Sequence, residues 1–335
     1  MIEGHGDDLY RYSGKVKYNF STNIVSDMDH RKLTGYLSTV MSSIGSYPEP
    51  APFSLEKMIA KKIGVEPDNV VVTNGATDAM YRIAHIKSGK RAAIRIPTFR
   101  EYQDACVAYG HEIAFFNDID DVPVADSVWL CNPNNPTGEV LDKCEILHLS
   151  NDRDSSWIIV DQAYADYTQL PVITPAEAVE SGNMILLSSL TKRFAVPGLR
   201  IGYLVAPREI AAEIRSAGMP WAVNSLAIEA GKYLLDHEAD YHIDAETLHA
   251  EALRIAEEFR KSGINCEPTD CNFILCRLSG RKASDLKKYL VENHEILIRD
   301  ASNFEGLDES YFRVAAQTAE QNDILLKAVD KWMNL

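Results

Sequence analysis

Short apolar, β-rich runs alternate with helix-forming stretches over the first two thirds of the chain, and this alternation constrains the fold more than any other feature. The runs that we expect to be strands are residues 69–73, 91–96, 112–116, 127–131, 156–161, 184–189 and 200–205. Several are apolar throughout, which is typical of strands that helices cover on both faces. The sequence therefore predicts an α/β fold, with a seven-stranded, mostly parallel sheet and helices on both of its faces.

The last two of these strands break the regular pattern. Only the irregular stretch "LTKRFAVPGL" separates them, and it contains Pro197 and Gly198. A connection of this length is short for a helical crossover between parallel strands. We therefore expect the seventh strand to run antiparallel to its neighbours.

The character of the chain changes after Pro220. A long helical stretch, 225–263, is followed by strand-like runs at 272–278, 295–300 and 311–316, a helix at 284–294 and a closing amphipathic helix. A break in the long helical stretch is expected near Asp240. This pattern predicts a smaller α+β domain. We expect residues 29–238 to form a large domain, and residues 1–28 and 239–335 to form the small one.

Composition and charge narrow the class of protein. The 335 residues include 34 basic and 49 acidic side chains, a net charge of -15, which disfavours nucleic-acid binding. The first residues resemble no signal peptide, and no apolar stretch approaches the roughly 20 residues that span a bilayer. The six cysteines form no C-x-x-C pair, so no metal site is indicated. We expect a reduced, cytoplasmic protein that binds neither membrane nor metal.

Polar and ionisable side chains follow the ends of the expected parallel strands, where ligands bind in α/β sheets. Gly75 turns the chain after the first strand, so the amides of Ala76 and Thr77 open a helix and can bind an anion. The other strands are followed by Phe99, Asn135, Asp161 with Tyr164, and Lys192. Each of these residues also has a structural interpretation, as a turn, a cap or a solvated side chain. Taken singly, none of them decides between a structural and a functional role.

One cofactor would use all of these groups together. Pyridoxal 5'-phosphate has an aldehyde that a lysine binds as an imine, a ring nitrogen that needs an acidic partner, a phenolic oxygen and a phosphate. A carboxylate such as Asp161 favours the protonated ring nitrogen. Arg200, eight residues after Lys192, and the hydroxyls of Ser189 and Thr191 could bind the phosphate.

Three motifs, "NPNNPTG", "VDQAY" and "SLTKRFAVPGLRIGY", occur in an order and at spacings that resemble the fold-type I pyridoxal-phosphate enzymes, the aspartate aminotransferase superfamily. The resemblance implies that Lys192 forms the imine and that Asp161 pairs with the ring nitrogen. It also implies roles for a larger set: Tyr164 and Asn135 at the phenolic oxygen, Phe99 on the ring face, and Ser189, Thr191, Arg200 and the amides of Ala76 and Thr77 at the phosphate. In this superfamily a tyrosine of the neighbouring subunit reaches the phosphate, and Tyr47 in "SYPEP" matches it. A homodimer is therefore implied.

Within the superfamily, the chain most resembles the branch that holds histidinol-phosphate aminotransferase and the L-threonine-O-3-phosphate decarboxylase of cobalamin biosynthesis. "PTFREY", "MPWAVNSLA" and "ILIRDASNFEGLDESYFRVA" resemble the decarboxylase. The chain departs from its usual pattern at Asp7, Asp8, the loop 23–26, Ala76–Thr77 and Gln317, which lie near the expected substrate side.

The branch implies a small phosphorylated amino substrate. Arg313 would bind its carboxylate and Arg299 its distal phosphate, with Asn23 and His5 lining the same pocket. A structural salt bridge is the alternative for Arg299. For the whole chain, the alternatives to a decarboxylase are a histidinol-phosphate aminotransferase or related class I/II enzyme, and a catalytically silent ligand-sensing protein.

Overall fold

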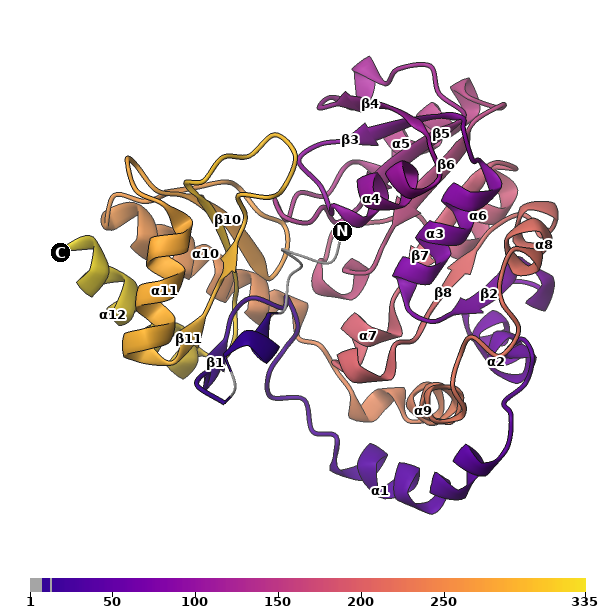
Figure 1. Ribbon diagram of the computed structural model, residues 1–335, viewed down its shortest axis with the longest axis horizontal. Coiled ribbons are helices and arrows are strands. Elements are labelled where there is room, and N and C mark those ends of the chain that lie inside the picture. Colours follow the sequence, from indigo (N-terminus) through magenta and orange to yellow (C-terminus); the bar gives the residue numbers. More distant parts are fainter. Residues whose placement is uncertain (1–7, 13) are drawn as a thin grey trace.

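The computed structural model describes residues 8–12 and 14–335, which form a larger and a smaller α/β body, each around its own sheet (Figure 1). The strands of the large sheet are β2 (Val70–Thr73), β3 (Arg91–Arg95), β4 (Glu112–Phe116), β5 (Ser127–Cys131), β6 (Trp157–Asp161), β7 (Met184–Ser188) and β8 (Gly202–Val205). All seven expected strands are present, within one or two residues of their predicted bounds.

The strand order of this sheet is β2-β8-β7-β6-β5-β3-β4. β8 is antiparallel to both of its neighbours, and the other pairs are parallel. The predicted mostly parallel sheet with an antiparallel seventh strand is therefore confirmed. β2 and β7 are both antiparallel to β8, so β2 points the same way as the remaining strands.

Helices cover both faces of the large sheet. Successive side chains of a strand point to opposite faces, so neighbouring residues pack against different helices. Val70 and Val72 pack with α2 (Phe53–Ile63) and α9 (Ser225–Asp236), whereas Val71 packs with α3 (Ala76–Ile86) and α8 (Arg208–Ser216). The other helices of this body are α1 (Arg31–Thr39), α4 (Glu101–Ala108), α5 (Lys143–Asp152), α6 (Pro175–Glu180) and the short α7 (Leu190–Arg193). This burial on two sides explains why several of the strands are apolar throughout.

The smaller body is an antiparallel sheet of order β12-β13-β10-β9, packed against three helices. Its elements are β9 (Asn265–Cys266), β10 (Phe273–Arg277), β12 (Arg299–Asp300), β13 (Tyr311–Ala315), α10 (Ala245–Lys261), α11 (Ala283–His294) and α12 (Ala319–Met333). The long helical stretch is broken, as predicted, by a 3-10 turn at Glu238–Asp240 between α9 and α10.

One predicted strand, 295–300, is wrong in detail, because the chain changes its pairing partner within it. β11 (Ile296–Leu297) pairs in parallel with β1 (Tyr18–Asn19), whereas β12 pairs with β13. Phe20, after β1, lies in the core of the smaller body, so the described part of the N-terminal segment packs there. The domain bounds 29–238, 1–28 and 239–335 stay a prediction.

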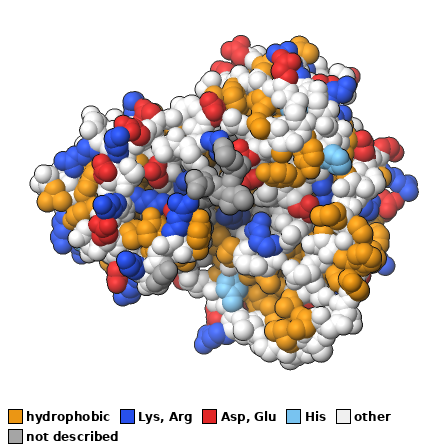
Figure 2. Space-filling model, viewed as in Figure 1, with side chains coloured by type: hydrophobic (Ala, Val, Ile, Leu, Met, Phe, Trp, Pro, Cys, Tyr) orange, Lys and Arg blue, Asp and Glu red, His pale blue; other side chains and the backbone are white. Residues whose placement is uncertain are grey.

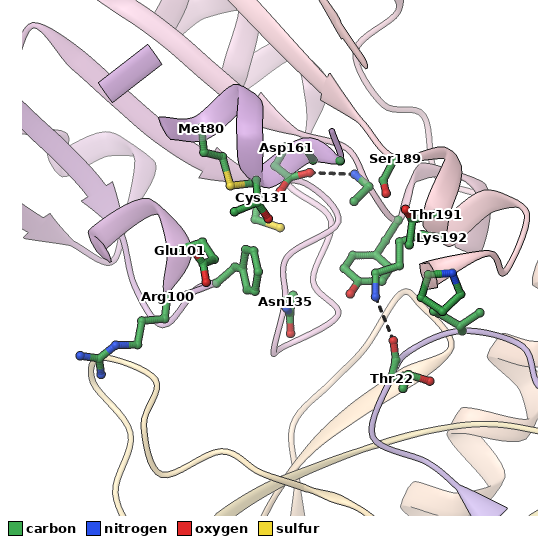
Figure 3. A pocket seen from close by; sticks show the side chains of 18 of the residues that line it. Thr22, Met80, Arg100, Glu101, Cys131, Asn135, Asp161, Ser189, Thr191 and Lys192 are labelled. Atoms are coloured by element: carbon green, nitrogen blue, oxygen red, sulfur yellow. Dashed lines mark hydrogen bonds between the residues drawn. The ribbon is translucent and has the colours of Figure 1, made fainter. Parts of the chain in front are cut away.

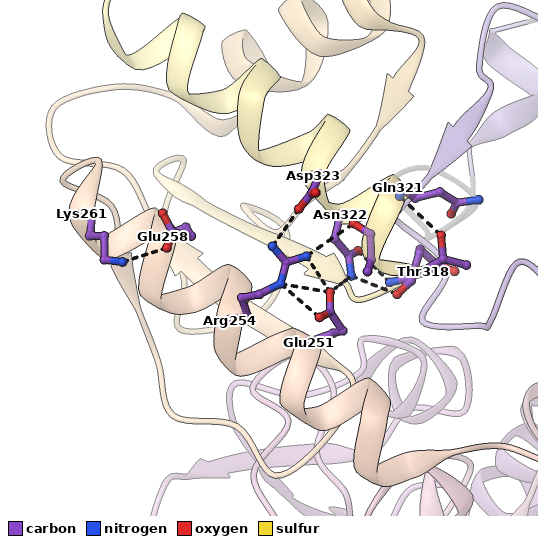
Figure 4. A network of polar contacts seen from close by, with 10 residues as sticks. Glu251, Arg254, Glu258, Lys261, Thr318, Gln321, Asn322 and Asp323 are labelled. Atoms are coloured by element: carbon purple, nitrogen blue, oxygen red, sulfur yellow. Dashed lines mark hydrogen bonds and ion pairs between the residues drawn. The ribbon is translucent and has the colours of Figure 1, made fainter.

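A polar network ties α10 to the start of α12 (Figure 4). The Arg254 guanidinium donates to Glu251 and to Asp323, at 2.7 and 2.8 Å. Asn322 donates to the same Glu251 at 2.7 Å and accepts from the backbone amide of Gln317 at 2.9 Å. The network fixes the turn that carries Gln317, whose side chain hydrogen-bonds the backbone of Ile24 and Ser26.

The described residues include no helix with the length and apolar character that crossing a membrane requires. The cytoplasmic location stays a prediction.

Candidate active site

The candidate site lies at the edge of the large sheet where its parallel strands end. β2, β3, β5, β6 and β7 bring their carboxyl ends to this edge, and antiparallel β8 brings its amino end. A cavity of about 310 Å³ lies here, between the two bodies. The predicted residues that line it are Ala76, Thr77, Phe99, Asn135, Asp161, Tyr164, Ser189, Thr191, Lys192, Arg200, Arg299 and Arg313.

Lys192 extends into this cavity from α7, directly after β7 (Figure 3). Its Nζ donates a hydrogen bond of 3.1 Å to the backbone carbonyl of Thr22, and lies 5.6 Å from the centre of the Tyr164 ring. Thr22 follows β1 in the N-terminal segment. The amine therefore lies at the junction of the two bodies, between the sheet edge and the segment that closes over it.

Asp161 is a buried carboxylate at the end of β6. It accepts hydrogen bonds from the Tyr102 hydroxyl at 2.7 Å and from the Ala163 amide at 2.9 Å. Burial raises its pKa above the ordinary 3.8, although these two bonds and the charge of Lys192 act in the opposite direction. A cation bound beside Asp161 would offset the cost of its burial.

An anion cradle lies at the start of α3. No side chain caps this helix end, and Gly75 adopts φ +79°, so the amides of Ala76 and Thr77 open toward the cavity wall. A Cβ on Gly75 would come within 2.7 Å of Nη2 of Arg200, which shows how closely that guanidinium approaches the turn. Ser189 and Thr191 line the same wall, and the Thr191 hydroxyl donates to the Ile201 carbonyl at 3.3 Å.

Two buried arginines face the opposite side of the cavity. Arg299 and Arg313 are directly opposite each other on β12 and β13, and are 7% and 3% exposed. Burial lowers the pKa of each to about 10. Arg313 donates to the Asn135 side chain and to the carbonyl of Ser21, and Arg299 donates to the Asn303 side chain at 2.6 Å.

No carboxylate among the described residues forms an ion pair with Arg313, and its buried Nε has no hydrogen-bond partner there. Two neighbouring cations in a cavity with lowered pKa values indicate an anionic ligand, because an anion would favour their charged forms.

Aromatic and amide side chains form the remaining walls. Phe99 packs edge-on against Tyr102, with ring centres 5.8 Å apart. Tyr164 is buried, which raises the pKa of its hydroxyl, while Arg313 and the Asn23 side chain act to lower it. Asn23 itself is fully buried and does not line the cavity, although its neighbours Thr22 and Ile24 do. The Asn23 side chain does act on Tyr164, which lines the cavity, and the expectation that Asn23 lines the substrate pocket stays a prediction.

Tyr47 does not line the cavity of the described chain. Tyr47 is 84% exposed and packs on Trp221, with ring centres 5.2 Å apart. The role of Tyr47 at the cofactor phosphate of a neighbouring subunit therefore stays a prediction. His5 lies outside the described residues.

Two further residues matter here: Tyr102, which the sequence did not single out, and Gln317, whose contacts it did not reveal. Tyr102, the last residue of "PTFREY", is the hydrogen-bond donor to Asp161, and its position three residues after Phe99 was the available signal. Gln317 accepts from the Ser26 amide at 2.9 Å and donates to the Ile24 carbonyl at 3.0 Å. It thereby holds the loop whose residue Ile24 lines the cavity. Its sequence position as a departure was noticed, but its partner, almost 300 residues away, was not predictable.

The donor set fits pyridoxal 5'-phosphate. One cavity is lined by the amine of Lys192, by the buried carboxylate of Asp161, which suits a cationic ring nitrogen, and by helix amides with a guanidinium, which suit a phosphate. The fold and this site define a fold-type I pyridoxal-phosphate-dependent enzyme.

Comparison with known proteins gives the family. The profile of the "Aminotransferase class I and II" family matches residues 16–329, so the chain belongs to this pyridoxal-phosphate-dependent family. The crystal structure of L-threonine-O-3-phosphate decarboxylase from Porphyromonas gingivalis is similar, with 39% identity and a TM-score of 0.92 over 95% of this chain and 100% of that chain. The seven-stranded fold and the enzyme class expected from the sequence are confirmed.

Two sequence relatives carry different names. Histidinol-phosphate aminotransferase of Caldanaerobacter subterraneus is 30% identical, over 85% of this chain and 84% of that protein. The adenosylcobalamin biosynthesis bifunctional protein CobDQ of Leptospira interrogans is 30% identical over 99% of this chain, which spans only 41% of that longer protein. The expected branch, with its decarboxylases and aminotransferases, is confirmed.

Proposed function

We propose that this protein decarboxylates L-threonine O-3-phosphate, or a close phosphorylated amino acid, with pyridoxal 5'-phosphate as cofactor. The observation that carries the proposal is the pair of buried arginines, Arg299 and Arg313, across the cavity from Lys192. A substrate with two separate anionic groups matches two neighbouring guanidinium groups. The similar structure from Porphyromonas gingivalis is named for this substrate, which supports the choice.

Each end of the cofactor has residues that would hold it. Lys192 would bind its aldehyde carbon, Asp161 its ring nitrogen, Tyr164 and Asn135 its phenolic oxygen, Phe99 its ring face, and Arg200, Ser189, Thr191 and the amides of Ala76 and Thr77 its phosphate. When bound, the cofactor supplies a ring that withdraws electrons from the substrate α-carbon. Asp161 keeps its negative charge beside the ring nitrogen and so favours the protonated form of that nitrogen.

The arginines orient the substrate. Arg313 would hold the α-carboxylate and Arg299 the distal phosphate through charge-assisted hydrogen bonds, which are strong and directional. Fixing both groups decides which bond at the α-carbon is presented for cleavage, and so which transition state is stabilised. Lys192 would then deliver a proton to the α-carbon that has lost carbon dioxide.

The alternative reaction is transamination, as the name of the Caldanaerobacter relative suggests. It needs the same cofactor-binding groups, but Lys192 would remove a proton from the substrate α-carbon and return it to a different carbon. The further alternative, a catalytically silent ligand-sensing protein, is disfavoured because both the amine of Lys192 and the carboxylate of Asp161 face the cavity.

One pair of incubations separates these reactions. The cofactor-loaded enzyme is given L-threonine O-3-phosphate, or histidinol phosphate with 2-oxoglutarate, and carbon dioxide and glutamate are measured. We expect carbon dioxide and a phosphorylated amino alcohol from the first mixture. The Lys192→Ala variant should form neither product. Stoichiometric glutamate from the second mixture, without carbon dioxide from the first, would overturn the decarboxylase and leave the cofactor assignment in place.

We also propose that the protein works as a homodimer in which Tyr47 of one subunit reaches the cofactor phosphate of the other. Large hydrophobic side chains that are exposed in the single chain support this, among them Met41, Ile44, Tyr47, Phe53, Met219 and Trp221. Figure 2 shows hydrophobic side chains gathered around α1, α2 and α9 on the face in view. Exposed apolar surface of this kind marks interaction sites, and two-fold dimers are the commonest oligomers.

A further inference from the structure

Two of the six cysteines lie side by side in the smaller body, far along the chain from the active-site motifs. Cys266 on β9 and Cys276 on β10 are directly opposite each other in an antiparallel pair, and their sulfur atoms are 3.5 Å apart. The Glu267 amide donates to the Leu275 carbonyl at 2.9 Å, so the next residue pair along is hydrogen-bonded. Cys266 and Cys276 therefore form the non-hydrogen-bonded pair, whose side chains approach most closely.

This geometry permits a disulfide without rebuilding the sheet. The Cα atoms of a non-hydrogen-bonded antiparallel pair are about 4.5 Å apart, within the range of about 4.4–6.8 Å that disulfides span. Side-chain rotation alone would have to bring the two sulfurs from 3.5 Å to bonding distance. The other cysteines have no such partner: Cys106, Cys131 and Cys271 are buried and Cys144 is exposed.

The two thiols differ in a way that assigns their roles. Cys266 is half-buried, and the hydrogen bond from Cys276 lowers its pKa, with a smaller contribution from the charge of Arg260. Cys276 is fully buried, which raises its pKa. Cys266 is thus the thiol that can ionise and meet an oxidant, and Cys276 is the one placed to attack it afterwards.

We propose that Cys266 and Cys276 are a site of reversible thiol oxidation, at which a peroxide converts the pair to a cross-strand disulfide. The Cys266 thiolate attacks one peroxide oxygen, so that an S–O bond forms, the O–O bond breaks and hydroxide leaves. The Cys276 sulfur then attacks the Cys266 sulfur, so that the S–S bond forms and the S–O bond breaks, and the second hydroxide leaves. With the two thiol protons, the products are one disulfide and two waters.

The disulfide would close the base of a hairpin that contacts the active-site wall. Between β9 and β10, the Asp270 amide donates to the Gly138 carbonyl at 2.9 Å, and the Asp270 carboxylate accepts from the Val140 amide at 3.0 Å. Gly138 belongs to the "NPNNPTG" loop that carries Asn135. Because a cross-link restricts the unfolded chain, oxidation should stabilise this hairpin and raise the melting temperature.

The experiment is done on the wild-type holoenzyme. The protein is treated with a small excess of hydrogen peroxide, denatured, alkylated at free thiols and weighed, and its peptides are sequenced. We expect four of the six cysteines to be alkylated, a loss of about 2 Da for the two hydrogens removed, and one cross-linked peptide pair containing residues 266 and 276. Dithiothreitol should restore six alkylated cysteines and the original melting temperature.

Variants test the order of attack. In Cys276→Ser, Cys266 should be trapped by a sulfenic-acid reagent, whereas in Cys266→Ser neither the cross-link nor the trapped adduct should form. Cys144→Ser, which removes the exposed cysteine, should behave as wild type. Alkylation of all six wild-type cysteines after peroxide treatment, or a cross-link between any other pair, would refute the proposal without the use of any variant.

Discussion

Charged side chains of the cavity are held in states that burial disfavours. The pKa of Asp161 is raised, and those of Arg299 and Arg313 are lowered to about 10, in each case mainly by burial. Burying a charge costs free energy unless a partner offsets it. The folded protein is therefore expected to be less stable when the cavity is empty than when it holds a ligand with a cationic and several anionic groups.

The first prediction concerns Asp161→Asn. An aspartate whose pKa is raised by folding destabilises the folded state when it is ionised, above its ordinary pKa, and this cost disappears as the pH falls below about 4. In protein stripped of cofactor, the variant should therefore melt higher than wild type at pH 7, and the gap should close as the pH is lowered toward that value. Melting curves at several pH values measure the difference.

With cofactor bound, the order should reverse. The asparagine can still accept from Ala163 and donate to Tyr102, but it offers no charge to the ring nitrogen. The loaded variant should melt below wild type and lose nearly all turnover. A variant that is less stable than wild type in the stripped form at pH 7 would contradict the burial cost assigned to this carboxylate.

The second prediction separates the two arginines. Lysine keeps the charge of arginine but cannot form its planar fork. At about 1.5–3 kcal/mol for a charged hydrogen bond, Arg313→Lys should lower kcat/KM by roughly ten- to hundredfold, for substrates with or without a phosphate. Arg299→Lys should raise KM for L-threonine O-3-phosphate, whereas kcat/KM for L-threonine, which has no phosphate, should equal that of wild type. Equal effects of the two variants on both substrates would contradict the separate roles.

At the residue scale, sequence was sufficient where the chemistry is local. The positions of Lys192 and Asp161 at the sheet edge were predictable, because Asp161 ends one recognisable strand and Lys192 lies four residues after the end of another. Tyr102 and Gln317 were not, because their roles depend on partners that only folding brings near. The same holds for Cys266, whose contact with Cys276 exists only once β9 pairs with β10.

At the scale of elements, several of the strands that sequence predicted well have two buried faces. β5, β6 and most of β7 are apolar because helices cover both sides, so composition alone marks them. The failure at residues 295–300 has the opposite cause. β11 and β12 are two residues long and are defined by pairing with β1 and β13, which no local pattern reveals.

The third prediction concerns the junction of β8 with the anion cradle. A Cβ at Gly202 would lie 2.7 Å from the Ala76 amide nitrogen and 2.9 Å from the Ser188 carbonyl oxygen. Backbone atoms cannot rotate away, so Gly202→Ala must displace the start of α3, at a cost of about 1–3 kcal/mol. The affinity for pyridoxal 5'-phosphate should fall, whereas that for pyridoxal, which lacks the phosphate, should change little. Titrations followed by absorbance measure both.

Gly35→Ala is the matched control for this change. Gly35 lies within α1, and a Cβ there would have no atom within 4 Å. Its affinity for both ligands should equal that of wild type. If Gly202→Ala weakened both ligands equally, the loss would reflect general distortion rather than the phosphate cradle.

At the scale of the whole molecule, the surface combines a net charge of -15 with an apolar patch. The patch includes Tyr47 and Trp221, which contact each other, and the Trp221 amide also donates to the Pro50 carbonyl at 2.9 Å. Like charge between two copies opposes association, so a dimer would have to bury apolar surface to form. A dimer that forms through this patch would bury the apolar side chains and so offset the repulsion between two negatively charged copies.

The last prediction tests whether active sites are shared between subunits. Lys192→Ala and Tyr47→Ala should each be impaired, the second through weaker cofactor binding. If Tyr47 serves the partner's site, a mixed dimer of these two variants contains one site with both residues intact. Random pairing then makes half of the dimers mixed, with one of their two sites intact, so about a quarter of wild-type activity should return.

A mixture of Lys192→Ala with Arg313→Lys should recover nothing, because both residues line the cavity of one chain. Activity is measured after the subunits are unfolded and refolded together, and light scattering gives the oligomeric state. A fully active monomer, or a Tyr47 mixture no more active than its parts, would refute the shared site.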